Sequence, residues 1–196
     1  CAIFGEVGHD RYGAICKTDF EDHGNDTSHL LIREATRTAL DIVLSDKETM
    51  GRSMVFYPGD ITRLSEDEIP VDDLKQTKYF FIAGVNPVTK KAAEIAKAHG
   101  AKIFIDADSY SEELVAYIPS IDIFVASEFV YNGMFDNDRY EENCKKVMEQ
   151  GPEIVVFTFG EKGAIGMSKD GYFTVPAYQV DVVDTVGAGD DFHGAF

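Results

Sequence analysis

The chain has 196 residues, 44% of them hydrophobic, and a formal net charge of −17 from 35 acidic and 18 basic residues. This length suffices for one sizeable core and argues against several domains. The acidic balance makes nucleic acid and anionic membrane surfaces poor partners, and no apolar run approaches the length of a membrane span. An anionic nucleotide would therefore need Mg²⁺ and local N–H groups in order to bind.

The cysteines and the two chain ends set further expectations. Cys1, Cys16 and Cys144 are odd in number and have no C-x-x-C spacing, so they suit a reducing cytoplasm better than a disulfide framework. The chain starts inside an apolar, strand-like run and stops one or two turns into a helix. Because isolated helix starts are unstable, we expect the sequence to be an excerpt of a longer, cytoplasmic protein.

The first 58 residues predict one helix among strands. A buried strand is expected to end over Cys1–Gly5, and Asp10 can cap a helix that runs to about His23 and is closed by Gly24. Three β-type segments follow without an intervening helix: His29–Arg33, Thr38–Leu44 and Ser53–Tyr57. We expect these three segments to form an antiparallel patch apart from the main sheet.

From Lys78 onward, strands and helices alternate. Strands are predicted at 79–83, 102–105, 121–125 and 154–158, and helices at 88–99, 112–117 and 139–150. This alternation builds a mostly parallel sheet that is covered by helices on both faces. After Gly160 two hairpin strands are expected, over 164–168 and 172–175. The predicted fold class is α/β with a small β appendage.

The last thirteen residues, Asp184–Phe196, turn through Gly187-Ala188-Gly189 and then open a helix. The first turn of a helix leaves N–H groups unpaired, and small residues allow an anion to approach them closely. Asp190 lies in that first turn with a carboxylate to use, which outlines a phosphoryl-transfer site. A single Asp at this position more often only stabilises the helix dipole, but helix capping does not require the surrounding glycines.

Two further segments follow predicted strands. Thr158-Phe159-Gly160-Glu161-Lys162-Gly163 places backbone and a threonine hydroxyl at the carboxyl edge of the sheet, where α/β folds bind ligands. A tight hairpin entry explains the same turn, and no G-x-x-x-x-G-K-[ST] loop occurs in the chain. Ser127 and Glu128 follow the strand at 121–125, where a plain helix N-cap with an acidic first turn is an equal explanation.

These segments resemble signatures of the PfkB (ribokinase-like) family of carbohydrate kinases. The string Asp-Thr-x-Gly-Ala-Gly-Asp-x-Phe-x-Gly is similar to the C-terminal signature of that family, and 158–163 looks like its Thr-x-Gly-x-x-Gly segment. Gly5–Gly13 resembles the end of its N-terminal signature, Gly-x-x-Gly-x-Asp-x-x-Gly, with a role in packing and turn geometry. The resemblance implies a ribokinase-like fold: a mostly parallel central sheet flanked by helices on both faces, and a small β-sheet lid. Residues 1–196 would then form a single kinase domain, truncated at both ends, with the lid at 28–58.

The resemblance also implies roles for the residues of the terminal motif. Asp190 would accept the proton of a substrate hydroxyl as its oxygen attacks the γ-phosphate of ATP. The N–H groups of Ala188, Gly189 and Asp190, in the turn after Gly187, would stabilise the charge on the transferred phosphoryl group. The side chain of Asp184 and the carbonyl of Val186 would help to bind a monovalent cation such as K⁺. A loop Asp that bonds its own turn is an equal explanation for Asp184.

Other implied roles belong to the nucleotide, the metal ion and the lid. The residues that would contact the nucleotide phosphates are Thr158, Phe159, Gly160, Gly163 and Ser127. Glu128 would order Mg²⁺ through water, although the chain departs from the family pattern with Ser127 in place of Asn and Val130 in place of a second acid. The candidates for the inner face of the lid are Thr38, Phe56 and Tyr57, for which sheet packing is the better explanation. The position of His193 in the sequence does not assign it a role.

The implied activity is Mg²⁺- and ATP-dependent phosphorylation of a sugar hydroxyl, as in a ribokinase or fructokinase. Within the fold, the acceptor could instead be a nucleoside or a phosphorylated sugar. A second phosphate would call for basic residues near the lid, and Arg33, Arg37 and Arg52 are the ones available. A nucleotide-binding relative without turnover is a further alternative, given Ser127 and Val130. Because lid strands in this family often pair between subunits, the resemblance also implies a homodimer through the lid.

Overall fold

The computed structural model describes residues 1–46, 52–60 and 64–196, without the side chain of Arg52. They form two compact units. Unit 1 comprises Cys1–Pro70 and Val182–Gly189, and unit 2 comprises Val71–Asp181 and Asp190–Phe196. Among these residues no helix is both long enough and apolar enough to cross a membrane.

Unit 1 begins with a strand, a helix and a second strand. β1 (Ala2–Gly8) and β2 (Asp26–Arg33) are parallel and are connected by α1 (Arg11–Asp22). The prediction that His29–Arg33 joins an antiparallel patch is wrong, because a crossover through a helix returns the chain to the starting end of the first strand. The strand predicted over Cys1–Gly5 continues to Gly8, and its buried residues are Val7 and Gly8.

Asp10 caps α1 as predicted, and it also binds a residue far along the chain. Its Oδ1 accepts hydrogen bonds from Gly13 N at 2.8 Å and from Thr38 Oγ1 at 2.7 Å, while its Oδ2 accepts one from Thr38 N at 2.8 Å. Thr38 Oγ1 in turn accepts a hydrogen bond from Gly8 N at 3.0 Å. A Cβ atom at Gly13 would lie 2.1 Å from Gly8 O, so the backbone packs here too closely for a side chain. The Gly5–Gly13 segment therefore serves packing and turn geometry, as expected.

The other sheet of unit 1 is an antiparallel hairpin. β3 (Leu40–Ser45) and β4 (Arg52–Tyr57) pair only with each other among the described strands, which confirms the antiparallel pairing expected for these two segments. The predicted lid at 28–58 includes residues 47–51, which lie outside the described residues, and it begins within β2, which belongs to the other sheet. Thr38 precedes β3 and is buried against Asp10, so packing explains it, whereas Phe56 and Tyr57 are exposed on β4.

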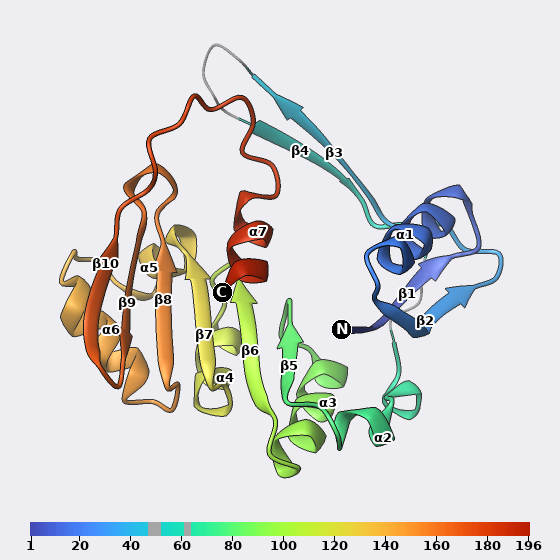
Figure 1. Ribbon diagram of the computed structural model, residues 1–196, viewed down its shortest axis with the longest axis horizontal. Helices are drawn as coiled ribbons and strands as arrows, with labels where there is room; N and C mark the ends of the chain where they lie inside the picture. The colour runs from blue at the N-terminus through green and yellow to red at the C-terminus, as the bar shows by residue number, and fades with distance from the viewer. Residues whose placement is uncertain (47–51, 61–63) are drawn as a thin grey trace. The chain divides into compact units, whose positions relative to one another are not determined.

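Unit 2 is built on a six-stranded sheet with the strand order β10-β9-β8-β7-β6-β5 (Figure 1). Its strands are β5 (Tyr79–Ile82), β6 (Lys102–Ala107), β7 (Ile123–Ser127), β8 (Ile154–Thr158), β9 (Ala164–Ser168) and β10 (Gly171–Val175). Strands β5 to β8 are parallel, and β9 and β10 are antiparallel to their neighbours. The predicted mostly parallel sheet with a terminal hairpin is confirmed.

Six α-helices follow Pro70 among the described residues. They are α2 (Val71–Leu74), α3 (Pro87–Ala98), α4 (Glu112–Tyr117), α5 (Glu128–Met134), α6 (Tyr140–Met148) and α7 (Ala188–Ala195). Short 3-10 turns lie at η1 (Glu66–Glu68) in unit 1, and at η2 (Ile118–Ser120) and η3 (Gly160–Lys162) in unit 2. The predicted helices at 88–99, 112–117 and 139–150 correspond to α3, α4 and α6.

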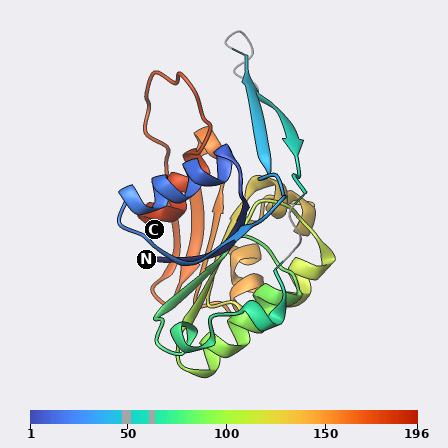
Figure 2. The same cartoon turned by 90° about the vertical axis from the view of Figure 1, so that its right-hand side faces the viewer.

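Helices lie on both faces of the unit 2 sheet. Helices α3 to α6 cover one face, while α7 lies on the other (Figures 1 and 2). On the α7 face, Phe192 packs against Val125 and Val156. On the opposite face, Ile103 and Ile105 of β6 are fully buried. Successive side chains of a strand point to opposite faces of the sheet, so β6 contributes apolar side chains to both covering layers. This packing fixes the carboxyl ends of β6, β7 and β8 at one edge of the sheet.

Candidate active site

Two residues predicted to bind the nucleotide meet at the carboxyl edge of the unit 2 sheet. Ser127 ends β7, Thr158 ends β8, and the two residues are partners in the parallel pairing of these strands. Asp106, next to the last residue of β6, is paired with Val125 on the neighbouring strand. Polar side chains at this edge are placed where ligands bind in α/β sheets.

The hydroxyl of Ser127 is used within the protein. Its Oγ donates a hydrogen bond to Asp108 O at 2.9 Å and so ties the loop after β6 to the end of β7. Ser127 is the N-cap residue of α5, but its side chain makes no cap hydrogen bond, so the plain N-cap explanation is wrong for this hydroxyl. Val130, where the family often carries a second acid, is fully buried in the core.

Glu128 remains at the surface of this edge. Its Oε1 lies 3.5 Å from Lys162 Nζ, and the two side chains are 42% and 67% exposed respectively. Water competes for an ion pair of this kind, which makes it weak. The carboxylate is thus accessible to solvent at the edge where β7 and β8 end.

The turn after β8 combines packing residues with one open glycine. Phe159 is buried against Tyr131 and Tyr140, with ring centroids 5.3 Å and 5.4 Å away, so a contact with phosphate would involve its main chain. Gly163 has φ 90°, and a Cβ atom there would lie 2.0 Å from Val175 O, so the hairpin itself requires this glycine. Gly160 has φ 54° and no atom within 4 Å of a Cβ position. Space for a ligand therefore exists at Gly160 and not at Gly163.

Within unit 1, Asp184 closes a turn of its own. Its Oδ1 accepts a hydrogen bond from Val186 N at 2.9 Å, and its Oδ2 accepts one from Ser45 Oγ at 3.1 Å. Ala188 N donates to Thr185 O at 3.2 Å, so this N–H group is engaged within the turn. Gly187 adopts φ 79°, which glycine accepts without strain. The part of Asp184 and Val186 in binding a monovalent cation stays a prediction.

The first turn of α7 presents a carboxylate next to open space. Asp190 is exposed and lies three residues before His193, whose ring contacts Asp106 near the end of β6. A Cβ atom built at Gly189 would have no other atom within 4 Å. The N–H groups of Gly189 and Asp190 belong to the turn in which helix geometry provides no partner. A small anion could approach the main chain there.

A pair that the sequence did not reveal lies beside Asp190. His193 Nε2 is 2.8 Å from Asp106 Oδ1, and the two side chains are 9% and 14% exposed. Burial raises the pKa of Asp106, the negative charges of Asp108 and Asp190 raise it further, and His193 lowers it. The sequence marks each member separately, as an acid at the end of an apolar strand and a histidine three residues after Asp190, but neither signal shows that the two residues meet.

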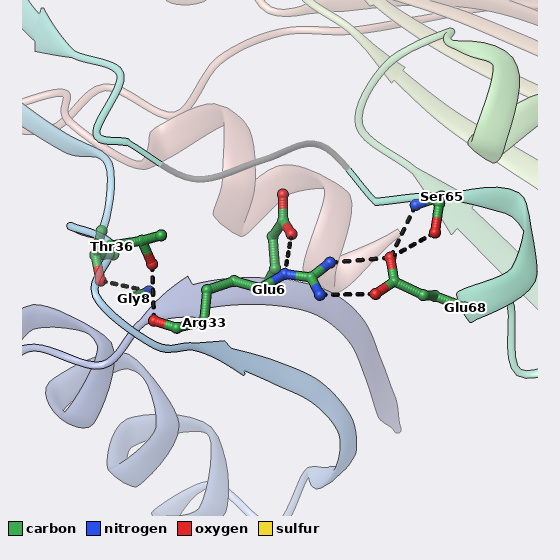
Figure 3. Close-up of polar contacts among 7 residues, drawn as sticks. Glu6, Gly8, Arg33, Thr36, Ser65 and Glu68 are labelled. Atoms are coloured by element: carbon green, nitrogen blue, oxygen red, sulfur yellow. Dashed lines mark hydrogen bonds and ion pairs between the residues drawn. The ribbon is translucent and has the colours of Figure 1, made fainter.

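Two arginines that were candidates for binding a substrate phosphate are held by carboxylates. The guanidinium of Arg33 lies between Glu6, at 2.8 Å from Nε, and Glu68, which it contacts at 2.7 and 2.9 Å (Figure 3). Arg33 lowers the pKa of Glu68 to about 2, and Ser65 contributes to this shift. Arg37 binds Asp60 at 2.6 Å. The side chain of Arg52 lies outside the described residues.

The donors at the sheet edge suit a metal ion that is bound largely through water. In the part of the chain that the structure describes, no three or more His, Cys, Asp or Glu side chains form a group that could hold a metal ion. Mg²⁺ usually keeps several of its waters and takes one or two carboxylates together with substrate phosphates. A single accessible carboxylate such as Glu128 fits that mode of binding.

Comparison with known proteins gives curated relatives among plant and bacterial sugar kinases. Fructokinase-1 of Zea mays is 29% identical over 216 residues, which cover 99% of this chain and 66% of the relative. Probable fructokinase-6 of Arabidopsis thaliana is 29% identical, with 97% and 55% covered. Ribokinase of Staphylococcus aureus is 27% identical, with 97% and 66% covered. The chain thus spans about 55–66% of the length of these relatives.

Solved structures agree with the fold. A candidate ribokinase II from E. coli, solved in complex with ATP and Mg²⁺, matches with a TM-score of 0.87 and 26% identity, covering 100% of this chain and 68% of that one. Ribokinase from Thermotoga maritima matches with a TM-score of 0.78 at 22% identity, covering 100% and 66%, which concerns the fold alone. The family model for PfkB family carbohydrate kinases matches residues 1–196. The chain therefore has a ribokinase-like fold and belongs to the PfkB family of carbohydrate kinases.

Proposed function

We propose that the protein is an ATP-dependent kinase that phosphorylates a hydroxyl group of a sugar, with Asp190 as the general base. The observation that carries this proposal is an exposed carboxylate in the first turn of α7, a helix that contacts the carboxyl end of β6 through His193, in a chain of the PfkB family. The fructokinases and the ribokinase among the relatives support a sugar as the acceptor.

In the proposed reaction, a carboxylate oxygen of Asp190 takes the proton of the acceptor hydroxyl, which makes that oxygen a better nucleophile toward the γ-phosphorus of ATP. The N–H groups of Gly189 and Asp190, at the positive end of the α7 dipole, stabilise the negative charge on the transferred phosphoryl group. The turn through Gly187 and Ala188 brings the chain into the helix at this point. The open space at Gly189 supports this assignment, because no described residue outside this stretch of helix has an atom within 4 Å of a Cβ position there.

The nucleotide phosphates are proposed to bind along the carboxyl ends of β7 and β8. Thr158 offers its hydroxyl and Gly160 offers open space, while Phe159 contributes its main chain. Ser127 acts by fixing the loop after β6, and Gly163 acts by closing the hairpin. Bound Mg²⁺ would offset the charge of the phosphates, with Glu128 holding it through water.

The acceptor is proposed to be a sugar without a phosphate group. A second phosphate needs a cation that is available for a bidentate contact. Of the three candidate arginines, the two whose side chains are described are already paired: Arg33 is bound by Glu6 and Glu68, and Arg37 is bound by Asp60, so neither is available without breaking an ion pair. A dependence on K⁺, a homodimer through the lid and a cytoplasmic location stay predictions.

The test is Mg·ATP-dependent ADP release by the full-length protein with a panel of ketoses, aldoses, sugar phosphates and nucleosides. Replacing Asp190 with Asn removes the base but keeps the shape, so kcat should fall about 10²- to 10⁴-fold while the affinity for ATP changes little. Asp191→Asn is the matched control, because Asp191 is an exposed acid in the same turn, and it should retain turnover.

Full turnover in Asp190→Asn would refute the base assignment. ATP binding without ADP release for every acceptor would instead favour the nucleotide-binding relative without turnover. Release with a sugar phosphate and none with the free sugar would contradict the proposed acceptor class.

A further inference from the structure

The pair formed by Asp106 and His193 joins the helix that carries Asp190 to the edge of the sheet. His193 follows Asp190 by three residues on α7, which is close to one helical turn, so the two side chains leave neighbouring parts of the helix surface. Asp106 stands near the carboxyl end of β6, and its Oδ1 lies 2.8 Å from His193 Nε2. All three residues belong to unit 2.

Asp106 and His193 meet in largely apolar surroundings. Asp106 Oδ1 lies 2.8 Å from His193 Nε2, and His193 Nδ1, on the other side of the ring, is buried without a hydrogen-bond partner among the described residues. The ring of His193 lies among those of Phe81, Phe104 and Phe192, with centroids 6.4, 6.0 and 6.0 Å away. Attraction between an imidazolium and a carboxylate is stronger in such apolar surroundings than in water.

The same location concentrates negative charge. The titratable groups that act on Asp106 are His193, Asp108 and Asp190, and the two aspartates repel it. Burial of a carboxylate next to two others is costly unless a positive charge offsets it. His193, when protonated, is the positive group in contact with Asp106.

We propose that Asp106 and His193 are positioning residues that hold the first turn of α7, and with it Asp190, at the carboxyl end of β6. This inference rests on the kinase function proposed above. The contact between His193 Nε2 and Asp106 Oδ1 ties α7 to β6, so that the base stays at the sheet edge. Neither residue touches the reacting atoms; the pair acts through the location of Asp190.

The experiment compares the full-length wild type with His193→Gln, Asp106→Asn and the double variant in ADP release. A displacement of the base by about 1 Å can cost about 100-fold in rate, so each single variant should lower kcat about 10- to 100-fold. The KM for ATP should change less than about twofold, because the pair does not contact the nucleotide. The double variant should be no slower than the slower single variant, since the two residues act as one unit.

His9→Gln is the matched control. His9 Nδ1 lies 2.7 Å from Glu34 Oε2, but these side chains are 65% and 80% exposed, so the same change removes an ion pair that water already weakens. Its kcat should equal that of the wild type.

The pH dependence of stability separates positioning from simple stabilisation of the fold. The pKa of Asp106 is raised in the folded state, so this group stabilises the fold below its ordinary pKa and loses that contribution as the pH rises through the raised value. Asp106→Asn should therefore keep or raise the melting temperature at pH 8 while it lowers kcat.

Wild-type kcat in both single variants would overturn the proposal. Additive losses in the double variant would overturn it as well. If the wild type releases no ADP with any acceptor, the proposed kinase function is wrong. Amide hydrogen exchange of α7 then tests separately whether Asp106 and His193 hold this helix. Faster exchange in His193→Gln than in His9→Gln would then support a pair that holds the helix, and equal exchange would refute it.

Discussion

At the scale of single residues, Asp10 shows how one carboxylate fastens two distant segments. It accepts three hydrogen bonds, one from Gly13 and two from Thr38, and these donors lower its pKa to about 2, with Gly13 N–H the largest cause. The sequence predicted the cap, because Asp before a helix is a local signal. It did not predict Thr38 as the partner, because that contact depends on how β3 follows β2.

Asp10→Asn should make unit 1 less stable at neutral pH. The pKa of Asp10 is lowered in the folded state, so its stabilising contribution is present above its ordinary pKa and is lost as the pH falls toward about 2. The variant should therefore differ most from the wild type near pH 7 and least near pH 2, as measured by amide hydrogen exchange of α1.

Asp22→Asn, an exposed change in the last turn of the same helix, is the control and should not reproduce this pH dependence. An Asp10→Asn protein with the same α1 exchange as the wild type at pH 7 would contradict the role assigned to the cap.

At the scale of elements, α7 holds two glycines in equivalent surroundings. Neither Gly189 in the first turn nor Gly194 in the last has an atom within 4 Å of a Cβ position. Glycine lowers the stability of a helix relative to alanine by about 1 kcal/mol. Packing against other segments therefore explains neither glycine, and the proposed anion site would explain Gly189 only.

Gly189→Ala should lower kcat/KM for ATP at least about 10-fold, because a methyl group occupies the space proposed for phosphate and weakens an interaction like that of an oxyanion hole. Gly194→Ala is its matched control and should retain full activity. Both variants should melt at or above the wild-type temperature, since alanine favours the helix. Full ADP release by Gly189→Ala would contradict the anion site.

The bounds of many elements could be read from the sequence. The helix at 112–117 and the strands at 154–158 and 164–168 were predicted with the bounds that the structure has. Their signals are local: Ser111 caps α4, and the two strands are apolar runs that end at a turn. The partner of β2 was predicted wrongly, because pairing is decided by the path of the chain and not by the strand itself.

At the scale of the whole molecule, all three cysteines are free. Cys1 is exposed and Cys16 is half-buried, whereas Cys144 is fully buried on α6. Burial raises the pKa of the Cys144 thiol to about 12. Since the thiolate is the reactive form, Cys144 should be inert in the folded protein.

A maleimide at neutral pH should therefore label Cys1 quickly, Cys16 more slowly and Cys144 only after unfolding. Peptide mass spectrometry of native and urea-treated protein measures this order. Labelling of Cys144 in the native protein at the rate of Cys1 would mean that α6 does not pack as described.

By itself the sequence determined the α/β class, the mostly parallel sheet and the positions of the residues proposed for the site, because hydrophobic periodicity, caps and glycine turns act over a few neighbouring residues. Only the tertiary structure decided that β2 is parallel to β1, that Arg33 is held by Glu6 and Glu68, and that Asp106 meets His193. Such contacts join residues that are distant along the chain, and their free energy depends on burial and on neighbouring charges that exist only in the folded protein.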